Sequence, residues 1–167
     1  MGLQFSGNFG LLGYCDNNWG GSIERRLSRT GYAFMLNNAT IIFRSMMQKS
    51  QSLSTAEAEY IALCAASHDA CYLLQMLSEL GMGDNAPITI LEDNQAAITN
   101  VVNDVASPKL KHVDIRFHFV RSMHRAKKID IVYCPGYFQA TDILTKSTDN
   151  LTFIRHRSTL MGMPYRP

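Results

Sequence analysis

The chain has 167 residues, of which 46% are hydrophobic and 18% are charged, and its formal net charge at pH 7 is +2. This length allows one domain with a buried core, and the composition excludes a disordered tail or a coiled coil. No apolar run reaches the ~18–20 residues of a membrane span, and residues 1–10 lack the basic start and apolar stretch of a signal peptide. We therefore expect a soluble intracellular protein.

Short strands dominate the first part of the expected fold. Apolar runs bounded by Asn, Asp and Gly predict strands, and Asn37-Asn38 is a turn signal that joins two of them in a hairpin. Three consecutive short strands before the first helix indicate an antiparallel meander. The expected strands cover residues 10–17, 31–37, 40–47, 88–93 and 129–133.

Apolar residues at spacings of three and four predict a long helix between Ser54 and Gly81. Ser54 and Glu57 have the spacing of a capping box at its start, and Gly81 is a typical end signal. Strands that later alternate with helices describe an α/β sheet with antiparallel and parallel parts. Further helices are expected at 94–103, 113–126 and 139–146, with helical structure resuming at 150–161.

The four cysteines are scattered and form no CxxC pair. Cys64 and Cys71 are two turns apart on the long helix, so their α-carbons should lie ~10 Å apart, which is too far for a disulfide. We expect reduced thiols and no cysteine metal site.

Charge is distributed unevenly along the chain. Residues 51–106 contain acidic side chains but no Lys or Arg, whereas residues 107–128 are strongly basic. This contrast fits a phosphate-binding surface beside an acidic, metal-attracting one, and it equally fits a solvated helix face. The basic side chains of the second segment are Lys109, Lys111, Arg116, Arg121, Arg125, Lys127 and Lys128.

Asp16, Glu59, Asp93 and Asp142 stand at the ends of expected strands or near the starts of expected helices. Hydrolysis of a phosphodiester by two metal ions needs several carboxylates around ions ~3.5–4 Å apart, and Mg²⁺ prefers oxygen ligands. Strand ends and helix starts at one edge of a sheet can bring such groups together. The structural alternatives are a turn at Asp16 and helix N-caps at Asp93 and Asp142.

Two pairs of neighbouring acids compete for these roles. The capping box uses Glu57 and leaves Glu59 free to be a ligand. Glu92 and Asp93 alternate along an expected strand and point to opposite faces of the sheet, so spacing does not decide between them.

Six sequence blocks include the four candidate acids. They are GYCDNNW (13–19), RLSRTGY (26–32), STAEAEYIAL (54–63), DNQAAI (93–98), KHVDIRFHFVR (111–121) and DILTK (142–146). In order and spacing, these blocks resemble the ribonuclease H domains of copia-type (Pseudoviridae) LTR retrotransposon polyproteins. The resemblance implies a ribonuclease H-like α/β fold, in which helices flank a mixed five-stranded sheet of three antiparallel strands followed by parallel ones. We expect one domain over 1–167, with a core at about 10–146 and a helical extension at 147–167.

The resemblance implies that Asp16, Glu59, Asp93 and Asp142 are the catalytic residues and the ligands of two Mg²⁺ (or Mn²⁺) ions. One ion would activate a water for in-line attack, and the other would stabilise the departing 3′-oxygen. The implied activity is endonucleolytic hydrolysis of the RNA strand of RNA–DNA hybrids during reverse transcription. The implied partners are the hybrid and a reverse transcriptase domain upstream in the same polyprotein, in cytoplasmic virus-like particles or the nucleus, with no membrane.

Hybrid recognition should come from contacts to phosphates and to the RNA 2′-OH. The resemblance points to Ser54, Thr55, Asn94 and Gln95 near the acids, although Asn94 and Gln95 equally fit ordinary polarity at a helix start. The expected phosphate-binding stripe consists of Lys109, Lys111, His112, His118, Arg121 and Arg125.

The loop 135–141 lacks the histidine that many ribonucleases H carry before the last acidic ligand. His112 or His118 is the expected substitute as a proton shuttle or phosphate contact, and each equally fits a helix-capping or packing role. Weaker candidates for substrate contacts are Arg44, Gln48 and Lys49.

Two other functions fit the same pattern. A domesticated ribonuclease H-fold module would bind nucleic acid or protein with weak or no turnover. Another nuclease of this fold, such as an integrase or resolvase, would cut duplex DNA, although the glutamate early in the first long helix favours ribonuclease H.

Overall fold

The computed structural model describes residues 10–22, 26–82, 86–103 and 114–164. The expected substrate contacts Lys109, Lys111 and His112 therefore lie outside the described residues. Within the described part no helix is long and apolar enough to cross a membrane.

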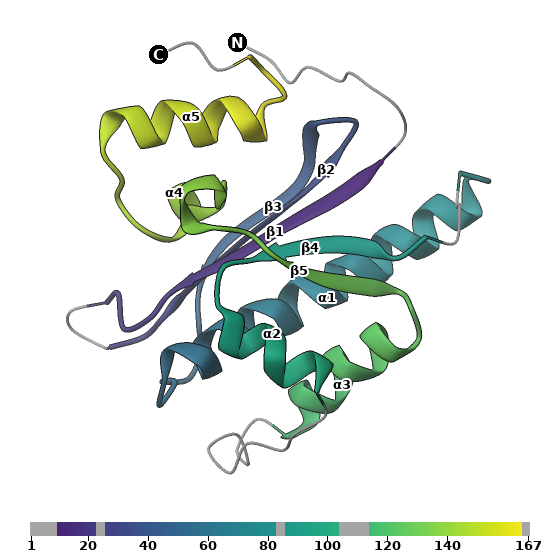
Figure 1. Cartoon of the computed structure of the whole chain (residues 1–167), viewed down its shortest axis with the longest axis horizontal. Helices are drawn as coiled ribbons and strands as arrows, with labels where there is room; N and C mark the ends of the chain where they lie inside the picture. The colour runs from purple at the N-terminus through teal and green to yellow at the C-terminus, as the bar shows by residue number, and fades with distance from the viewer. Residues whose placement is uncertain (1–9, 23–25, 83–85, 104–113, 165–167) are drawn as a thin grey trace.

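A five-stranded sheet forms the centre of the fold (Figure 1). Its strand order is β3-β2-β1-β4-β5. β1 pairs with β2 and β2 with β3 in antiparallel fashion, whereas β4 runs parallel to both β1 and β5. The expected mixed sheet is confirmed. The strands are β1 Leu11–Asn18, β2 Arg29–Leu36, β3 Ala39–Met47, β4 Ile88–Glu92 and β5 Ile129–Tyr133.

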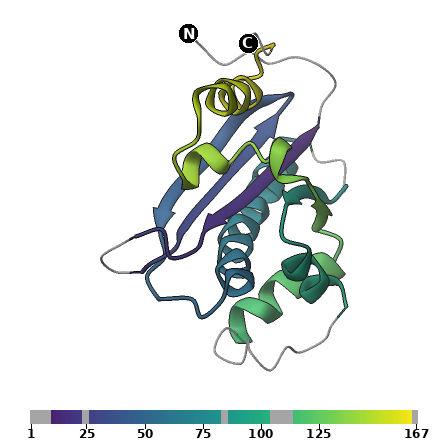
Figure 2. The ribbon, with the colours of Figure 1, turned by 60° about the vertical axis from the view of Figure 1, so that its left-hand side comes forward.

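Helices cover both faces of the sheet (Figures 1 and 2). The helices α1, α2 and α3 lie on one face, and α4 and α5 lie on the other. The helices are α1 Thr55–Glu79, α2 Gln95–Val102, α3 Asp114–Arg125, α4 Asp142–Thr145 and α5 Asn150–Leu160, with a 3-10 turn η2 at Gly136–Phe138.

The alternation of side chains along β2 explains why both faces are covered. Tyr32 and Phe34 belong to the large core under α1 and α3, while Ala33 and Met35 pack on the opposite face with Leu160 of α5. Successive residues of a strand point to opposite faces, so a strand that is apolar at every position needs a layer on each side.

Local signals act as expected at the hairpin and at α1. Asn37 and Asn38 have φ angles of 49° and 64°, the left-handed conformation of a tight hairpin turn. Ser54 caps α1 by accepting the Glu57 N–H at 3.2 Å. The Glu57 carboxylate accepts the Leu53 N–H at 2.6 Å, one residue before the partner that a capping box would give it.

The helix expected at 139–146 is wrong in its extent. Only Asp142–Thr145 forms a helical turn, and Gln139 has an extended backbone with φ −72° and ψ 91°. The side chain of Gln139 is fully buried and bound to strand carbonyls, so this tertiary contact replaces the first turn of the expected helix.

Candidate active site

The carboxylates of Asp16, Glu59 and Asp93 meet at one edge of the sheet. Among the described residues these three acids offer ligand atoms that all lie within 4.8 Å of one another. Asp16 is 2% exposed and Glu59 is 6% exposed, whereas Asp93 is partly exposed. The arrangement is therefore a buried acidic cluster that opens to solvent on the side of Asp93.

The parallel pairing of β1 and β4 brings two of these acids together. Tyr14 of β1 is in register with Leu91 of β4. Asp16 lies two residues after Tyr14, and Asp93 lies two residues after Leu91. The two parallel strands therefore bring a carboxylate each to the same edge of the sheet. Glu59 reaches the edge from the start of α1, since Ser54 fixes where that helix begins.

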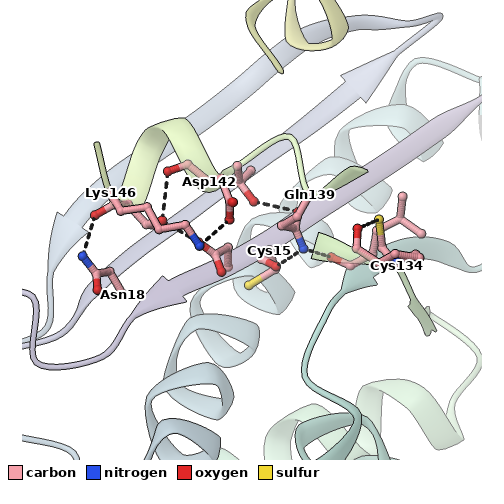
Figure 3. Close-up of polar contacts among 11 residues, drawn as sticks. Cys15, Asn18, Cys134, Gln139, Asp142 and Lys146 are labelled. Carbon is pink, nitrogen blue, oxygen red and sulfur yellow. Dashed lines mark hydrogen bonds and ion pairs between the residues drawn. The ribbon is translucent and has the colours of Figure 1, made fainter. Parts of the chain in front are cut away.

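Asp142 lies at the margin of the cluster. Its Oδ1 atom is 2.9 Å from Nζ of Lys146, four residues along the chain (Figure 3). The negative charge of Asp142 nonetheless raises the pKa of Asp16 and of Asp93, which places it within electrostatic reach of both. Three of the four expected ligands therefore converge, and the fourth is engaged by a lysine.

The clustered acids hold protons more tightly than ordinary carboxyl groups. Burial raises the pKa of Asp16 to about 7, although the Thr145 hydrogen bond and the charge of Lys146 lower it. Burial and the charge of Asp16 raise the pKa of Glu59 to about 9. Burial followed by the charge of Asp142 also raises the pKa of Asp93. Burial and mutual repulsion make it unfavourable for Asp16, Glu59 and Asp93 all to be ionised unless a cation compensates their charge.

The donor set fits a hard divalent cation. All three clustered side chains offer carboxylate oxygens, which Mg²⁺ and Mn²⁺ prefer. Oε2 of Glu59 is buried without a hydrogen-bond partner. A buried, unpaired carboxylate oxygen that faces two further acids is the kind of atom that a metal ion satisfies.

The structure separates Asp93 from Glu92, which spacing could not do. Glu92 is fully buried, and its Oε1 accepts the Asn94 N–H at 3.1 Å. Burial and then the charge of Glu59 raise the pKa of Glu92 well above its usual range. Asp93 belongs to the acidic cluster, so the sequence-based choice of Asp93 and Glu59 over their neighbours matches the geometry.

Thr145 connects α4 to the acidic cluster. Its hydroxyl donates to Oδ2 of Asp16. Its carbonyl oxygen accepts from Nδ2 of Asn18, which is labelled in Figure 3, at 3.3 Å. Gly31 of β2 permits this approach, because a β-carbon there would lie 2.5 Å from Cγ2 of Thr145. Sequence reasoning missed this contact, since Gly31 and Thr145 are far apart along the chain.

Gln139 joins three parts of the site. Its buried Nε2 donates to the carbonyl oxygens of Cys15 at 2.8 Å and Leu91 at 3.4 Å, and its Oε1 accepts from Thr141 at 2.9 Å (Figure 3). The two carbonyls belong to β1 and β4, just before Asp16 and Asp93. Gln139 therefore holds together the segments that carry the acids, a role that no sequence pattern indicated.

Most expected substrate contacts near the acids are at helix starts. Ser54 is the N-cap of α1, and Asn94 caps α2 by accepting the N–H groups of Ala96 and Ala97 at 3.0 and 3.1 Å. Asp93 and Asp142 are therefore not the N-caps, because Asn94 and Thr141 hold those positions. Thr55 and Gln95 are exposed at the first positions of their helices.

The expected basic stripe on α3 is only partly exposed. His118 and Arg125 lie on the surface. Arg121 is 5% exposed. Its guanidinium donates two hydrogen bonds to the carbonyl oxygen of Asn100, from Nη2 at 2.6 Å and from Nε at 2.9 Å. The guanidinium carbon also lies 4.1 Å from the centre of the Phe117 ring. The expectation that Arg121 belongs to an exposed phosphate-binding stripe is wrong, because α2 packs over this part of α3.

The weaker candidates for substrate contacts in and after β3 differ in how accessible they are to a substrate. Gln48 is buried, and its Nε2 donates to Thr30 at 3.1 Å and to the Ala58 carbonyl at 2.9 Å. Arg44 forms an ion pair with Asp69 at 3.5 Å. Lys49 is exposed. Gln48 therefore has a structural role.

Known proteins related in sequence include transposon polyproteins. The chain is 34% identical over 145 residues to the retrovirus-related Pol polyprotein from transposon TNT 1-94 of Nicotiana tabacum, covering 86% of this chain and 11% of that polyprotein. It is 28% identical over 151 residues to the Pol polyprotein from transposon RE2 of Arabidopsis thaliana, covering 90% and 10%. The chain thus spans about a tenth of the length of these polyproteins. No protein-family model matches it.

Solved structures with the same fold are ribonucleases H. LC11-RNase H1, isolated from compost by a metagenomic approach, superposes with a TM-score of 0.60 at 19% identity, covering 81% of this chain and 92% of that one. The complex of LC11-RNase H1 with an RNA/DNA hybrid gives the same TM-score at 20% identity, covering 81% and 93%. At these identities the similarity establishes the fold. The chain is a ribonuclease H-fold domain homologous to part of the Pol polyproteins of copia-type plant transposons.

Proposed function

We propose that this chain hydrolyses the RNA strand of RNA–DNA hybrids with the help of divalent cations. The observation that carries the proposal is the convergence of Asp16, Glu59 and Asp93 at one edge of a ribonuclease H fold. A ribonuclease H of this fold has been solved with an RNA/DNA hybrid, which supports the choice of substrate.

Asp16, Glu59 and Asp93 would hold a divalent cation, and Asp142 is near enough to contribute to a second one. Such cations, when bound, activate a water molecule and stabilise the departing 3′-oxygen. The chain itself supplies rigid placement: Thr145 orients Asp16 by a hydrogen bond, and Gln139 ties together the strands that carry Asp16 and Asp93. Rigid placement matters because hydrolysis depends on in-line geometry at phosphorus.

Two groups of exposed residues are proposed to contact the hybrid. Thr55 and Gln95 stand at helix N-termini beside the acidic cluster, where backbone N–H groups favour phosphate. His118 and Arg125 are exposed on α3 and would add phosphate contacts farther along the duplex. Ser54 and Asn94 act on the hybrid mainly through the helix starts that they cap.

The wider context is also a proposal. Since the relatives are Pol polyproteins, we propose that the activity serves reverse transcription together with a reverse transcriptase domain of the same polyprotein. The location, in cytoplasmic virus-like particles or the nucleus, stays a prediction.

A cleavage assay with three labelled substrates tests the activity. The substrates are an RNA–DNA hybrid, duplex DNA and single-stranded RNA, each with and without Mg²⁺. We expect Mg²⁺-dependent loss of only the hybridised RNA, and no cleavage by the Asp16→Asn variant. Glu79→Gln is the matched control, because Glu79 is exposed at the far end of α1. Duplex DNA cleavage would favour a resolvase-like nuclease, and hybrid binding without cleavage would favour an inactive binding module.

A further inference from the structure

Lys146 is a positive charge placed beside the acidic cluster. Its Nζ atom lies 2.9 Å from Oδ1 of Asp142, and its side chain is 41% exposed. Burial lowers the pKa of Lys146, but the hydrogen bond to Asp142 and the charges of Asp16 and Asp93 raise it to a greater extent. The ammonium group therefore interacts with acids from α4, β1 and the end of β4.

The position of Lys146 is set by the backbone. Its N–H donates to the Asp142 carbonyl at 3.0 Å, which ends the single turn of α4. The preceding residue, Thr145, is bound through its side chain to Asp16 and through its carbonyl to Asn18. Lys146 is thus anchored at the root of its side chain, while its ammonium end can move by leaving the partly exposed ion pair with Asp142.

There is room for that movement. Lys146 lines an open hollow of about 510 Å³ on the α4 side, together with Arg29, Ser45 and Phe153. A long, flexible lysine side chain can turn from Asp142 toward such a space by breaking one partly exposed ion pair.

We infer that Lys146 is a resident counter-ion of the acidic cluster, which occupies Asp142 in the metal-free protein and competes with a divalent cation for that carboxylate. This inference rests on the proposed function, since it concerns the same metal site. The Lys146 ammonium is paired with Asp142 and not with the three clustered acids, so Asp142 becomes a ligand only after Lys146 turns away. The four expected ligands therefore differ in their availability to a cation, because Lys146 competes for Asp142.

Calorimetric titration with Mn²⁺ tests the inference without any measurement of activity. We expect Lys146→Met to bind Mn²⁺ about two- to fivefold more tightly than the wild type, because the competing charge is gone. Lys146→Arg keeps the charge and should stay within about twofold of the wild type. Lys128→Met removes an exposed lysine at the end of α3, away from the cluster, and is the matched control.

A double-mutant cycle separates competition at Asp142 from a general effect of charge. In an Asp142→Asn background, Lys146→Met should bring little further gain in Mn²⁺ affinity. A full gain in that background would overturn the inference, because Lys146 would then act through its field alone. Equal or weaker Mn²⁺ binding by Lys146→Met, with wild-type binding intact, would also overturn it. Absence of Mn²⁺ binding by the wild type would instead defeat the proposed metal site itself.

Discussion

Gln139 donates its side-chain amide to the carbonyl oxygen of Cys15 at 2.8 Å, and Cys15 directly precedes Asp16. The same amide reaches the carbonyl of Leu91 on the neighbouring strand at 3.4 Å. The β1–β4 ladder stops at Tyr14 and Leu91, so Gln139 continues the connection between the strands where their own hydrogen bonds end. Asp16 and Asp93 lie two residues beyond the end of this ladder. We therefore expect the Gln139 hydrogen bonds to fix the distance between these two acids.

Gln139→Leu should therefore impair catalysis beyond its effect on stability. Loss of the amide leaves buried carbonyls unpaired, which should lower the free energy of unfolding by about 1–3 kcal/mol. Misplacement of Asp16 and Asp93 should lower kcat by on the order of 100-fold while KM for the hybrid changes little. Urea unfolding and steady-state cleavage measure the two effects.

Leu77→Ala is the control for Gln139→Leu. Leu77 is buried near the end of α1 that lies away from the acids, and its truncation should cost about 2–5 kcal/mol. Below its unfolding range this variant should keep a wild-type kcat. If Gln139→Leu retains a wild-type kcat as well, Gln139 is only a packing residue.

Gly31→Ala should displace α4 from the sheet. The added methyl group would lie 2.5 Å from Cγ2 of Thr145 and 3.0 Å from Cβ of Leu144. We expect a loss of about 1–3 kcal/mol in unfolding free energy, together with slower hybrid cleavage. Adding Thr145→Ser removes Cγ2 but keeps the hydroxyl that binds Asp16, so the double variant should recover part of the loss. No recovery would show that the Thr145 contact is not the cause.

The metal-free protein should lose stability as the pH rises. The pKa of Glu59 is about 9 in the folded protein, against an ordinary value of 4.5 for a glutamate. Between these values the folded state binds more protons than the unfolded state, so the contribution is fully present below about pH 4.5 and is lost as the pH rises through about 9. Asp16, with a folded pKa of about 7, adds the same trend between about pH 4 and 7.

Glu59→Gln should flatten this pH dependence. Melting temperatures in EDTA should show Glu59→Gln gaining on the wild type between pH 5 and pH 9, because glutamine has no proton to lose. Glu79→Gln, an exposed control on the same helix, should follow the wild type. A constant difference between Glu59→Gln and the wild type across this range would contradict the raised pKa.

Arg121 and Arg125 should respond differently to truncation. Arg121→Ala removes a guanidinium that satisfies the Asn100 carbonyl, so it should cost about 1–3 kcal/mol in urea unfolding. Arg125 is exposed, so Arg125→Ala should cost less stability than Arg121→Ala and should reduce the salt dependence of hybrid binding. The reverse pattern would restore Arg121 to the substrate surface.

The sequence predicted the features that depend on local periodicity. Neighbouring residues determine where strands end, where helices begin and where the Asn37-Asn38 turn forms. The sheet, and the edge of it at which Asp16 and Asp93 meet, could therefore be predicted. The resemblance to a known family added the choice of Asp93 over Glu92 and the ribonuclease H-like form of the five-stranded sheet.

The features that depend on distant partners could not be foreseen. Arg121 was expected in an exposed basic stripe, but α2 covers it and supplies the Asn100 carbonyl that its guanidinium binds. Gln139 was expected to begin a helix, but its side chain binds carbonyl oxygens of two strands instead. Asp142 was expected among the metal ligands, and only the three-dimensional position of Lys146 shows that this carboxylate has another partner.

Anomalous diffraction from crystals soaked in Mn²⁺ tests the central claim most directly. We expect an anomalous peak bounded by carboxylate oxygens of Asp16, Glu59 and Asp93, and its loss in Asp16→Asn crystals soaked in the same way. A wild-type crystal whose only Mn²⁺ peaks lie elsewhere on the chain would contradict the assignment of this edge of the sheet as the metal site.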